Sequence, residues 1–391
     1  RPEGGDWTKY LYTYRIWGRM LYNPDTPREV WSRFLKTEFG QAADDCEIAL
    51  GHASRVLLLI TTAHTPSCSN NGYWPEIHWN LPIVKGDHFG NVSPLDPALF
   101  TTAAEFADEL VSGKRSGKYS PMQVAQWLED LAEVASAHLA RARGKIADAR
   151  NPAFRRLAID TEIQAGTATY FAEKLRAAVA YAFYRKVRDG AAIREALSRY
   201  KASRDAWAKL SETAKGIYVP DITFGPNSVL RGHWADRLAA IDKDLADMEK
   251  LAKEATAAAE PEETSVSWAG AISRPGFLAS DRQFRPRCQH LPPATFRPGK
   301  PIPVEISVEP GYRLSSAVLH YRHVDQSDAY QVVEMSARDG RWRAEIPAEY
   351  TDSAYPLLYY VELHDPRGAV WLYPGLNASL ANQPYFIIRR A

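Results

Sequence analysis

The sequence lacks the features that define several large classes of protein. Its 391 residues include only three cysteines, too few for a disulfide scaffold, and at least one of them is unpaired within the chain. No run of about 18 apolar residues is present, so the sequence predicts no membrane span. Lysine and arginine total 48 against 47 acidic residues. This balance argues against a nucleic-acid partner, because such domains are usually strongly basic.

Motifs for nucleotides, metals and serine nucleophiles are also missing. The chain contains no glycine-rich dinucleotide fingerprint, no phosphate-binding loop and no nucleophile elbow. It has no paired cysteine motif of the zinc type, and the spacing of His64, Glu76 and His78 fits no zinc site. We therefore expect neither a cofactor nor a bound metal. The chain starts at Arg1 rather than at methionine, which we interpret as a processed or truncated end.

Aromatic residues, by contrast, are abundant. The chain carries 11 tryptophans and 20 tyrosines. Flat rings stack on sugars or bases, and they also fill protein cores. Trp7, Tyr10, Tyr14 and Trp17 recur at helical spacing. We expect that row to be core, because aromatic rows of this period usually face the interior.

The periodicity changes along the chain and predicts two domains. Apolar residues recur at three- and four-residue steps through residues 1–256, which predicts an α-helical domain that includes one helix over about 41–62. Residues 257–300 are rich in alanine, glutamate, proline and arginine and read as a linker or extended connection. Seven short segments of residues 301–391 alternate with a period of two. The expected fold class is α+β multidomain, an all-α helical bundle followed by an immunoglobulin- or fibronectin III-like β-sandwich.

A long segment without periodicity, from Ala63 to about Asp96, interrupts the helical domain. Loops of this length are usually functional or disordered, and this one is too rich in aromatic residues for disorder. Its part from 64 to 79 gathers polar and aromatic side chains in one place. The candidate ligand contacts are Asn70, Asn71, Tyr73, Trp74, His78 and Trp79.

Sugars need rings for their apolar faces and amide, carboxylate or imidazole groups for their hydroxyls. Glu76 is the candidate general acid or base, with His64 as its catalytic companion, because burial against Trp74 or Trp79 would raise the pKa of the Glu76 carboxyl. The alternative is that the tryptophans anchor the loop while the asparagines make turns.

A second irregular stretch, Asp221–Arg237, places Arg231 and His233 at a helix start beside Asp221. A helix N-terminus attracts anions, and an arginine grips a carboxylate in a bidentate fork. These two residues are therefore candidate substrate contacts. The alternative is an ion-pair network that ties the loop to the following helix.

The run Tyr14–Trp31, which reads YRIWGRMLYNPDTPREVW and is followed by Phe39-Gly40, resembles a segment that follows the catalytic barrel in bacterial α-glucuronidase-like glycoside hydrolases. The resemblance implies a carbohydrate-active protein with a helical region packed on a barrel, acting on a plant or microbial polysaccharide in the periplasm or outside the cell. This chain has no alternating strands and helices of a barrel, so no catalytic carboxylates carry over. Expected partners are a polysaccharide or oligosaccharide, together with a preceding barrel domain or a second copy of the chain.

Two other functions remain open from the residues. A helical region followed by a sandwich also occurs in polysaccharide lyases, in which case Tyr73, His64 or Glu76 would act as acid and base. The chain could also be a structural or dimerising module without a ligand. A cleft lined by Trp74, Glu76 and His78 distinguishes the glycosidase interpretation from the other two.

Overall fold

The computed structural model describes residues 6–64, 81–222, 231–257, 266–277 and 286–391. The chain forms two compact units. The first comprises Arg1–Ala107 and Ser120–Trp268, and the second comprises Asp108–Tyr119 and Ala269–Ala391. The first is helical and the second holds two β-sheets, so the α+β multidomain class is confirmed. The short stretch from Asp108 to Tyr119 joins the second unit, which the sequence did not predict.

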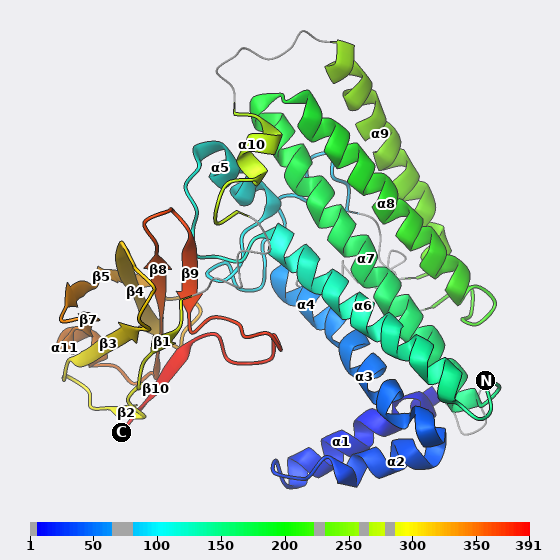
Figure 1. Ribbon diagram of the computed structural model, residues 1–391, viewed down its shortest axis with the longest axis horizontal. Coiled ribbons are helices and arrows are strands. Elements are labelled where there is room, and N and C mark those ends of the chain that lie inside the picture. The colour runs from blue at the N-terminus through cyan, green and yellow to red at the C-terminus, as the bar shows by residue number, and fades with distance from the viewer. Residues whose placement is uncertain (1–5, 65–80, 223–230, 258–265, 278–285) are drawn as a thin grey trace. The chain divides into compact units, whose positions relative to one another are not determined.

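Three long helices form the centre of the helical unit. They are α6 (Pro121–Lys145), α7 (Pro152–Val187) and α8 (Gly190–Ala214), which lie side by side (Figure 1). The residue before each helix caps it. Ser120 forms a capping box with Gln123, whereas Asn151 and Asp189 accept hydrogen bonds from the first amides of α7 and α8.

Shorter helices surround these three. The others of the helical unit are η1 (Asp6–Tyr10), α1 (Leu11–Tyr22), α2 (Glu29–Phe39), η2 (Gly40–Ala42), α3 (Ala43–Ala53), α4 (Arg55–Ala63), η4 (Trp234–Arg237) and α9 (Leu238–Ala257). Helix α5 (Ala103–Ser112) crosses the boundary between the units, and α10 (Trp268–Ile272) begins at that boundary. The central helices bury large side chains, including Tyr170, Phe171 and Trp207. Each such burial contributes roughly 1.5–3 kcal/mol to folding.

The helix predicted over 41–62 is two helices, α3 and α4, which are separated at Ser54. By length and composition alone, the stretch Glu29–Ala63 would pass for a membrane span. It is divided among α2, η2, α3 and α4. Leu35, Cys46 and Val56 are buried, whereas Leu58 is 64% exposed.

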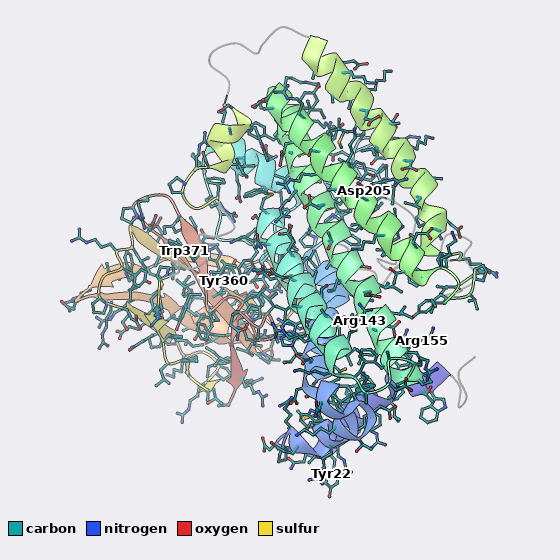
Figure 2. The ribbon with its side chains drawn as sticks, turned by 45° about the vertical axis from the view of Figure 1, so that its right-hand side comes forward. Tyr22, Arg143, Arg155, Asp205, Tyr360 and Trp371 are labelled. Carbon is teal, nitrogen blue, oxygen red and sulfur yellow. The ribbon has the colours of Figure 1, made fainter. Side chains whose placement is uncertain are left out.

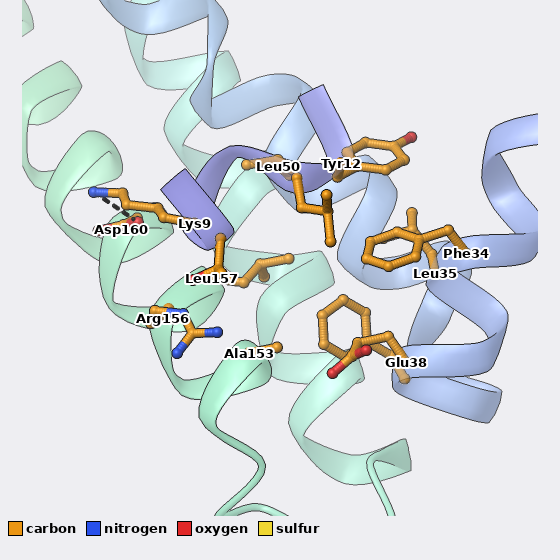
Figure 3. Close-up of a pocket in the computed structure, with 13 residues that line it drawn as sticks. Lys9, Tyr12, Phe34, Leu35, Glu38, Leu50, Ala153, Arg156, Leu157 and Asp160 are labelled. Atoms are coloured by element: carbon orange, nitrogen blue, oxygen red, sulfur yellow. Dashed lines mark ion pairs between the residues drawn. The ribbon is translucent and has the colours of Figure 1, made fainter. Parts of the chain in front are cut away.

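The prediction that the first aromatic row is core was wrong. Trp7, Tyr10, Tyr14 and Trp17 are 56, 48, 50 and 63% exposed. Helix α1 docks through its opposite side, where the Tyr12 hydroxyl donates to Glu47 at 2.8 Å. A small cavity of about 80 Å³ remains beneath η1 and α1, beside the Lys9–Asp160 ion pair (Figure 3). Periodicity identifies an apolar stripe, but it does not reveal whether another element covers that stripe.

The second unit contains two sheets packed face to face. One sheet has the strand order β1-β3-β7-β6, and the other has the order β2-β10-β8-β4-β5 with β9 paired to β8. Their bounds are Cys288–Gln289 (β1), Thr295–Phe296 (β2), Ile302–Val308 (β3), Ser316–His323 (β4), Gln331–Glu334 (β5), Ser336–Arg338 (β6), Arg341–Ile346 (β7), Leu357–His364 (β8), Val370–Tyr373 (β9) and Phe386–Arg390 (β10), with the one-turn helix α11 (Ala348–Thr351) after β7.

The seven predicted strands correspond to β3, β4, β5, β7, β8, β9 and β10. Their alternation places Val304 and Ile306 of one sheet in the same core as Leu319 and Val361 of the other. The predicted linker 257–300 differs from the structure in its described part. Helix α10 lies within it, and β1 and β2 pair with β3 and β10 of the sheets.

Candidate functional site

Most of the predicted sugar contacts lie outside the described residues. Asn70, Asn71, Tyr73, Trp74, Glu76, His78 and Trp79 belong to the segment 65–80, on which the structure gives no information. The residues on either side of that segment are described. They show how the two ends of the segment are held.

The N-terminal end is held by His64, the residue that follows α4. Its side chain is buried, and its ring lies 4.1 Å from the ring of Phe89. The Nε2–H group donates a hydrogen bond of 2.9 Å to the Phe89 carbonyl. Burial lowers the pKa of His64 to about 4, so the imidazole is neutral at pH 7. This burial favours an anchoring role over the catalytic role that the sequence suggested.

The C-terminal end is held by Lys174 of α7. Its ammonium group is fully buried and donates to the Leu81 carbonyl at 2.8 Å and to the Tyr170 hydroxyl at 3.0 Å. The same nitrogen lies 4.6 Å from the centre of the Phe89 ring. Desolvation lowers the pKa of Lys174 to about 7, although the negative charge of Asp244 opposes this shift.

Asp244 of α9 completes the cluster. It is buried, and its carboxylate accepts hydrogen bonds from the Ile83 amide at 2.7 Å and the Val84 amide at 3.1 Å. His64 after α4, Lys174 of α7 and Asp244 of α9 therefore hold the described residues on either side of the segment 65–80. We call His64, Phe89, Tyr170, Lys174 and Asp244 the anchor cluster.

The anchor cluster has the chemistry of a support rather than of a reactive centre. An amine with a pKa near 7 could in principle accept a proton from a substrate. The Lys174 nitrogen, however, is inaccessible to solvent and already bonded to a carbonyl and a hydroxyl. Lys174 and Asp244 were not among the functional residues expected from the sequence. The available signal was a lysine on the apolar side of a long helix, four residues after Tyr170.

The second candidate forms an ion-pair network. Arg231 donates to the Asp221 carboxylate at 2.6 and 3.2 Å, and the Gly232 amide donates to the other oxygen at 2.9 Å. His233 is buried and caps η4, accepting a hydrogen bond from the Ala235 amide at 3.2 Å. These contacts favour the alternative interpretation of Arg231 and His233, in which they tie the loop to the following helix and do not contact a substrate. Residues 223–230 between them and Asp221 lie outside the described residues.

A line of buried rings connects the two candidates. Tyr170 of the anchor cluster contacts Trp207, with ring centres 4.6 Å apart, and Trp207 donates from its indole N–H to the Trp234 carbonyl. The Trp234 ring contacts His233 at 5.3 Å. None of the described contacts joins His64 directly to Arg231 or His233. The two loops are therefore supported by one core without forming one site in the part of the chain that the structure describes.

A broad groove of about 850 Å³ runs over α6, α7 and α8. Its polar walls include Arg143 and Asp205, which are labelled in Figure 2. The Arg143 guanidinium is paired with Glu162 at 2.7 Å. Among the described residues that line this groove there is no tryptophan, tyrosine or phenylalanine. It lacks the flat apolar surface on which a sugar ring stacks, so it is a weaker candidate for a glycan site.

Part of this chain is similar in fold to a solved enzyme structure. The structure of a GH138 enzyme targeting pectin rhamnogalacturonan II matches with a TM-score of 0.52 and 15% sequence identity. This chain shares its fold with part of a glycoside hydrolase. The match covers 62% of this chain and 38% of that one, so this chain aligns with well under half of the enzyme. No family model and no curated protein sequence matches.

Proposed function

We propose that this protein is carbohydrate-active and related to glycoside hydrolases, and that the segment 64–79 contributes contacts to a plant or microbial polysaccharide. The observation that carries the proposal is the fold shared with the GH138 enzyme over 62% of the chain. The resemblance of Tyr14–Trp31 to α-glucuronidase-like enzymes gives separate support, because it comes from sequence alone. A periplasmic or secreted location would give access to such a substrate.

In this proposal Trp74 and Trp79 stack on pyranose rings, and Asn70, Asn71, Tyr73 and His78 bind hydroxyl groups. Glu76 serves as the general acid or base. The anchor cluster supports this assignment, because a loop that positions a sugar must have fixed ends. His64 then holds the segment and does not touch the substrate. Arg231 and His233 are less favoured as sugar contacts, since Arg231 is paired with Asp221 and the His233 side chain is buried.

We expect Trp74→Ala to weaken glycan binding about tenfold, equivalent to about 1.4 kcal/mol, because an indole stacked on a sugar loses its contact surface. The measurement is calorimetric titration against plant and microbial polysaccharides. Reducing-sugar release from the same panel would show whether the bound glycan is also cleaved.

The control variant is Tyr355→Ala, which removes an aromatic side chain that is 53% exposed in the sandwich unit. It should bind as the wild type does. Equal affinity of wild type and Trp74→Ala would remove the segment from the binding site. A wild-type protein that binds no member of the panel would contradict the proposed function and favour the structural module.

A further inference from the structure

The exposed side of α1 presents a surface that the proposed function does not use. An open hollow of about 410 Å³ is lined by Tyr14 of the aromatic row together with Arg15, Gly18, Arg19 and Tyr22, and we call it the α1 hollow. A Cβ atom added at Gly18 would meet no atom within 4 Å, so the missing side chain leaves open space over this turn.

Two tyrosine rings bound the α1 hollow along the helix. Tyr14 and Tyr22 are eight residues apart, a distance of about 12 Å along the helix axis. Tyr14 is 50% exposed and Tyr22 is 90% exposed. Figure 2 shows Tyr22 pointing away from the helices at the margin of the helical unit. Rings separated in this way can contact more than one unit of a linear oligomer.

The charged residues that line the α1 hollow, Arg15 and Arg19, are both basic. No acidic residue occurs between Trp7 and Pro24, whereas Lys9, Arg15 and Arg19 are all basic. Lys9 is paired with Asp160 at 3.1 Å. Arg15 and Arg19 are exposed, and neither forms an ion pair among the described residues. The Arg15 guanidinium lies 4.4 Å from the ring centre of Phe34, a contact that stabilises its position.

We propose that the α1 hollow binds an acidic oligosaccharide, one whose sugar units carry carboxylates. This inference rests on the proposed function and adds a ligand class and a second site. The tyrosine rings contact the apolar faces of two sugar units, while Arg15 and Arg19 bind the carboxylates between them. The charge complementarity selects an acidic glycan over a neutral one. The near-zero net charge of the whole chain, +1, argues against a general polyanion site.

The experiment is calorimetric titration of the intact chain with a tetramer of galacturonic acid and with its methyl ester. The ester has the same rings without the charges. We expect wild type to bind the acid at least about tenfold more tightly than the ester and to lose affinity as salt increases. Arg19→Gln should bring the two affinities close together, because the guanidinium distinguishes the ligands. Arg33→Gln, an exposed arginine of the neighbouring α2, is the matched control and should bind as wild type does.

A substitution that fills the α1 hollow gives a second test, in which a loss of binding cannot be due to a folding defect. Gly18 lies inside α1 with open space above it, so Gly18→Leu should raise the melting temperature, since leucine favours helix more than glycine does. The same variant should abolish binding of the acidic tetramer, because the leucine side chain would fill part of the α1 hollow. A stable protein that has lost binding cannot be explained by misfolding.

Four outcomes would overturn the inference. Acidic tetramer binding that persists in Gly18→Leu and Arg19→Gln places the ligand elsewhere and leaves the proposed function intact. A wild-type protein that binds the polysaccharide panel but neither tetramer also rejects only the α1 hollow. Binding to no glycan at all rejects both proposals. If light scattering shows a dimer that Gly18→Leu converts to a monomer, the surface is an interface between copies of the chain instead.

Discussion

Lys174→Ala lowers the free energy of unfolding of the helical unit by about 3–5 kcal/mol, the largest loss of stability that we expect from a single substitution. Removing a fully buried side chain leaves a cavity. It also leaves the Leu81 carbonyl and the Tyr170 hydroxyl without their buried donor. Urea denaturation followed by circular dichroism measures the loss. Lys174→Met separates its two causes, because methionine fills most of the volume but cannot donate.

Lys201→Ala is the matched control on the next helix. Lys201 pairs with Glu249 at 2.8 Å with both side chains substantially exposed, so its loss should leave the free energy of unfolding almost unchanged. Chymotrypsin gives a second readout, since the segment 65–80 contains Tyr73, Trp74 and Trp79. We expect faster cleavage there in Lys174→Met than in Lys201→Ala. Equal denaturation midpoints and equal cleavage rates would show that Lys174 does not anchor the segment.

The sequence predicted those parts of the fold that depend on local chemistry. The Ser120-Pro121 and Asn151-Pro152 pairs stand at the starts of α6 and α7, and such pairs favour a helix start because capping and proline placement act over a few residues. The strands of the sandwich were recognisable because alternation reflects one buried face. The break at Ser54 was not recognisable, since apolar residues continue on both sides of it and the nearby Gly51 lies inside α3 rather than at the break.

The anchor cluster could not be predicted for a different reason. His64, Phe89, Lys174 and Asp244 are separated by up to 180 residues in the sequence, as the numbers of the first and last show. No spacing relates them, because packing of α4, α7 and α9 brings them together. The prediction that Trp17 is buried failed for the same reason. Its periodicity was read correctly, but only the arrangement of neighbouring helices decides which stripe of α1 is buried.

These two failures have a common consequence for function. The sequence placed the sugar-binding chemistry in the segment 64–79 and treated the first aromatic row as core. The structure places His64 inside and the rings of α1 outside. Exposed aromatic side chains are therefore found on α1, in addition to those that we propose for the segment 64–79. A carbohydrate-active chain with two such surfaces could hold a long polymer at more than one position, which is how we connect the two proposals.

The stability of the helical unit should fall as the pH is lowered from about 6.5 to about 4, and His64 should account for up to about 3 kcal/mol of that fall. Burial lowers the pKa of His64 from 6.5 to about 4 in the folded state. Between these values the unfolded chain binds a proton that the folded chain does not, so acid favours unfolding. A difference of about 2.5 units corresponds to about 3 kcal/mol at 1.36 kcal/mol per unit. Urea midpoints measured at steps of half a pH unit give the slope.

His64→Phe should flatten this slope, because phenylalanine has a similar ring and no titrating nitrogen. The variant loses the hydrogen bond to the Phe89 carbonyl, so its stability at pH 7 should fall by about 1–3 kcal/mol while its dependence on pH decreases. His88→Gln is the control, since His88 is exposed in the same part of the chain and should leave the slope unchanged. A wild-type slope retained in His64→Phe would mean that other groups, such as the carboxylates, cause the acid sensitivity. Loss of the slope in His88→Gln would show that His88, and not His64, causes the pH dependence. It would also contradict the neutral anchor that we assign to His64 at the start of the segment.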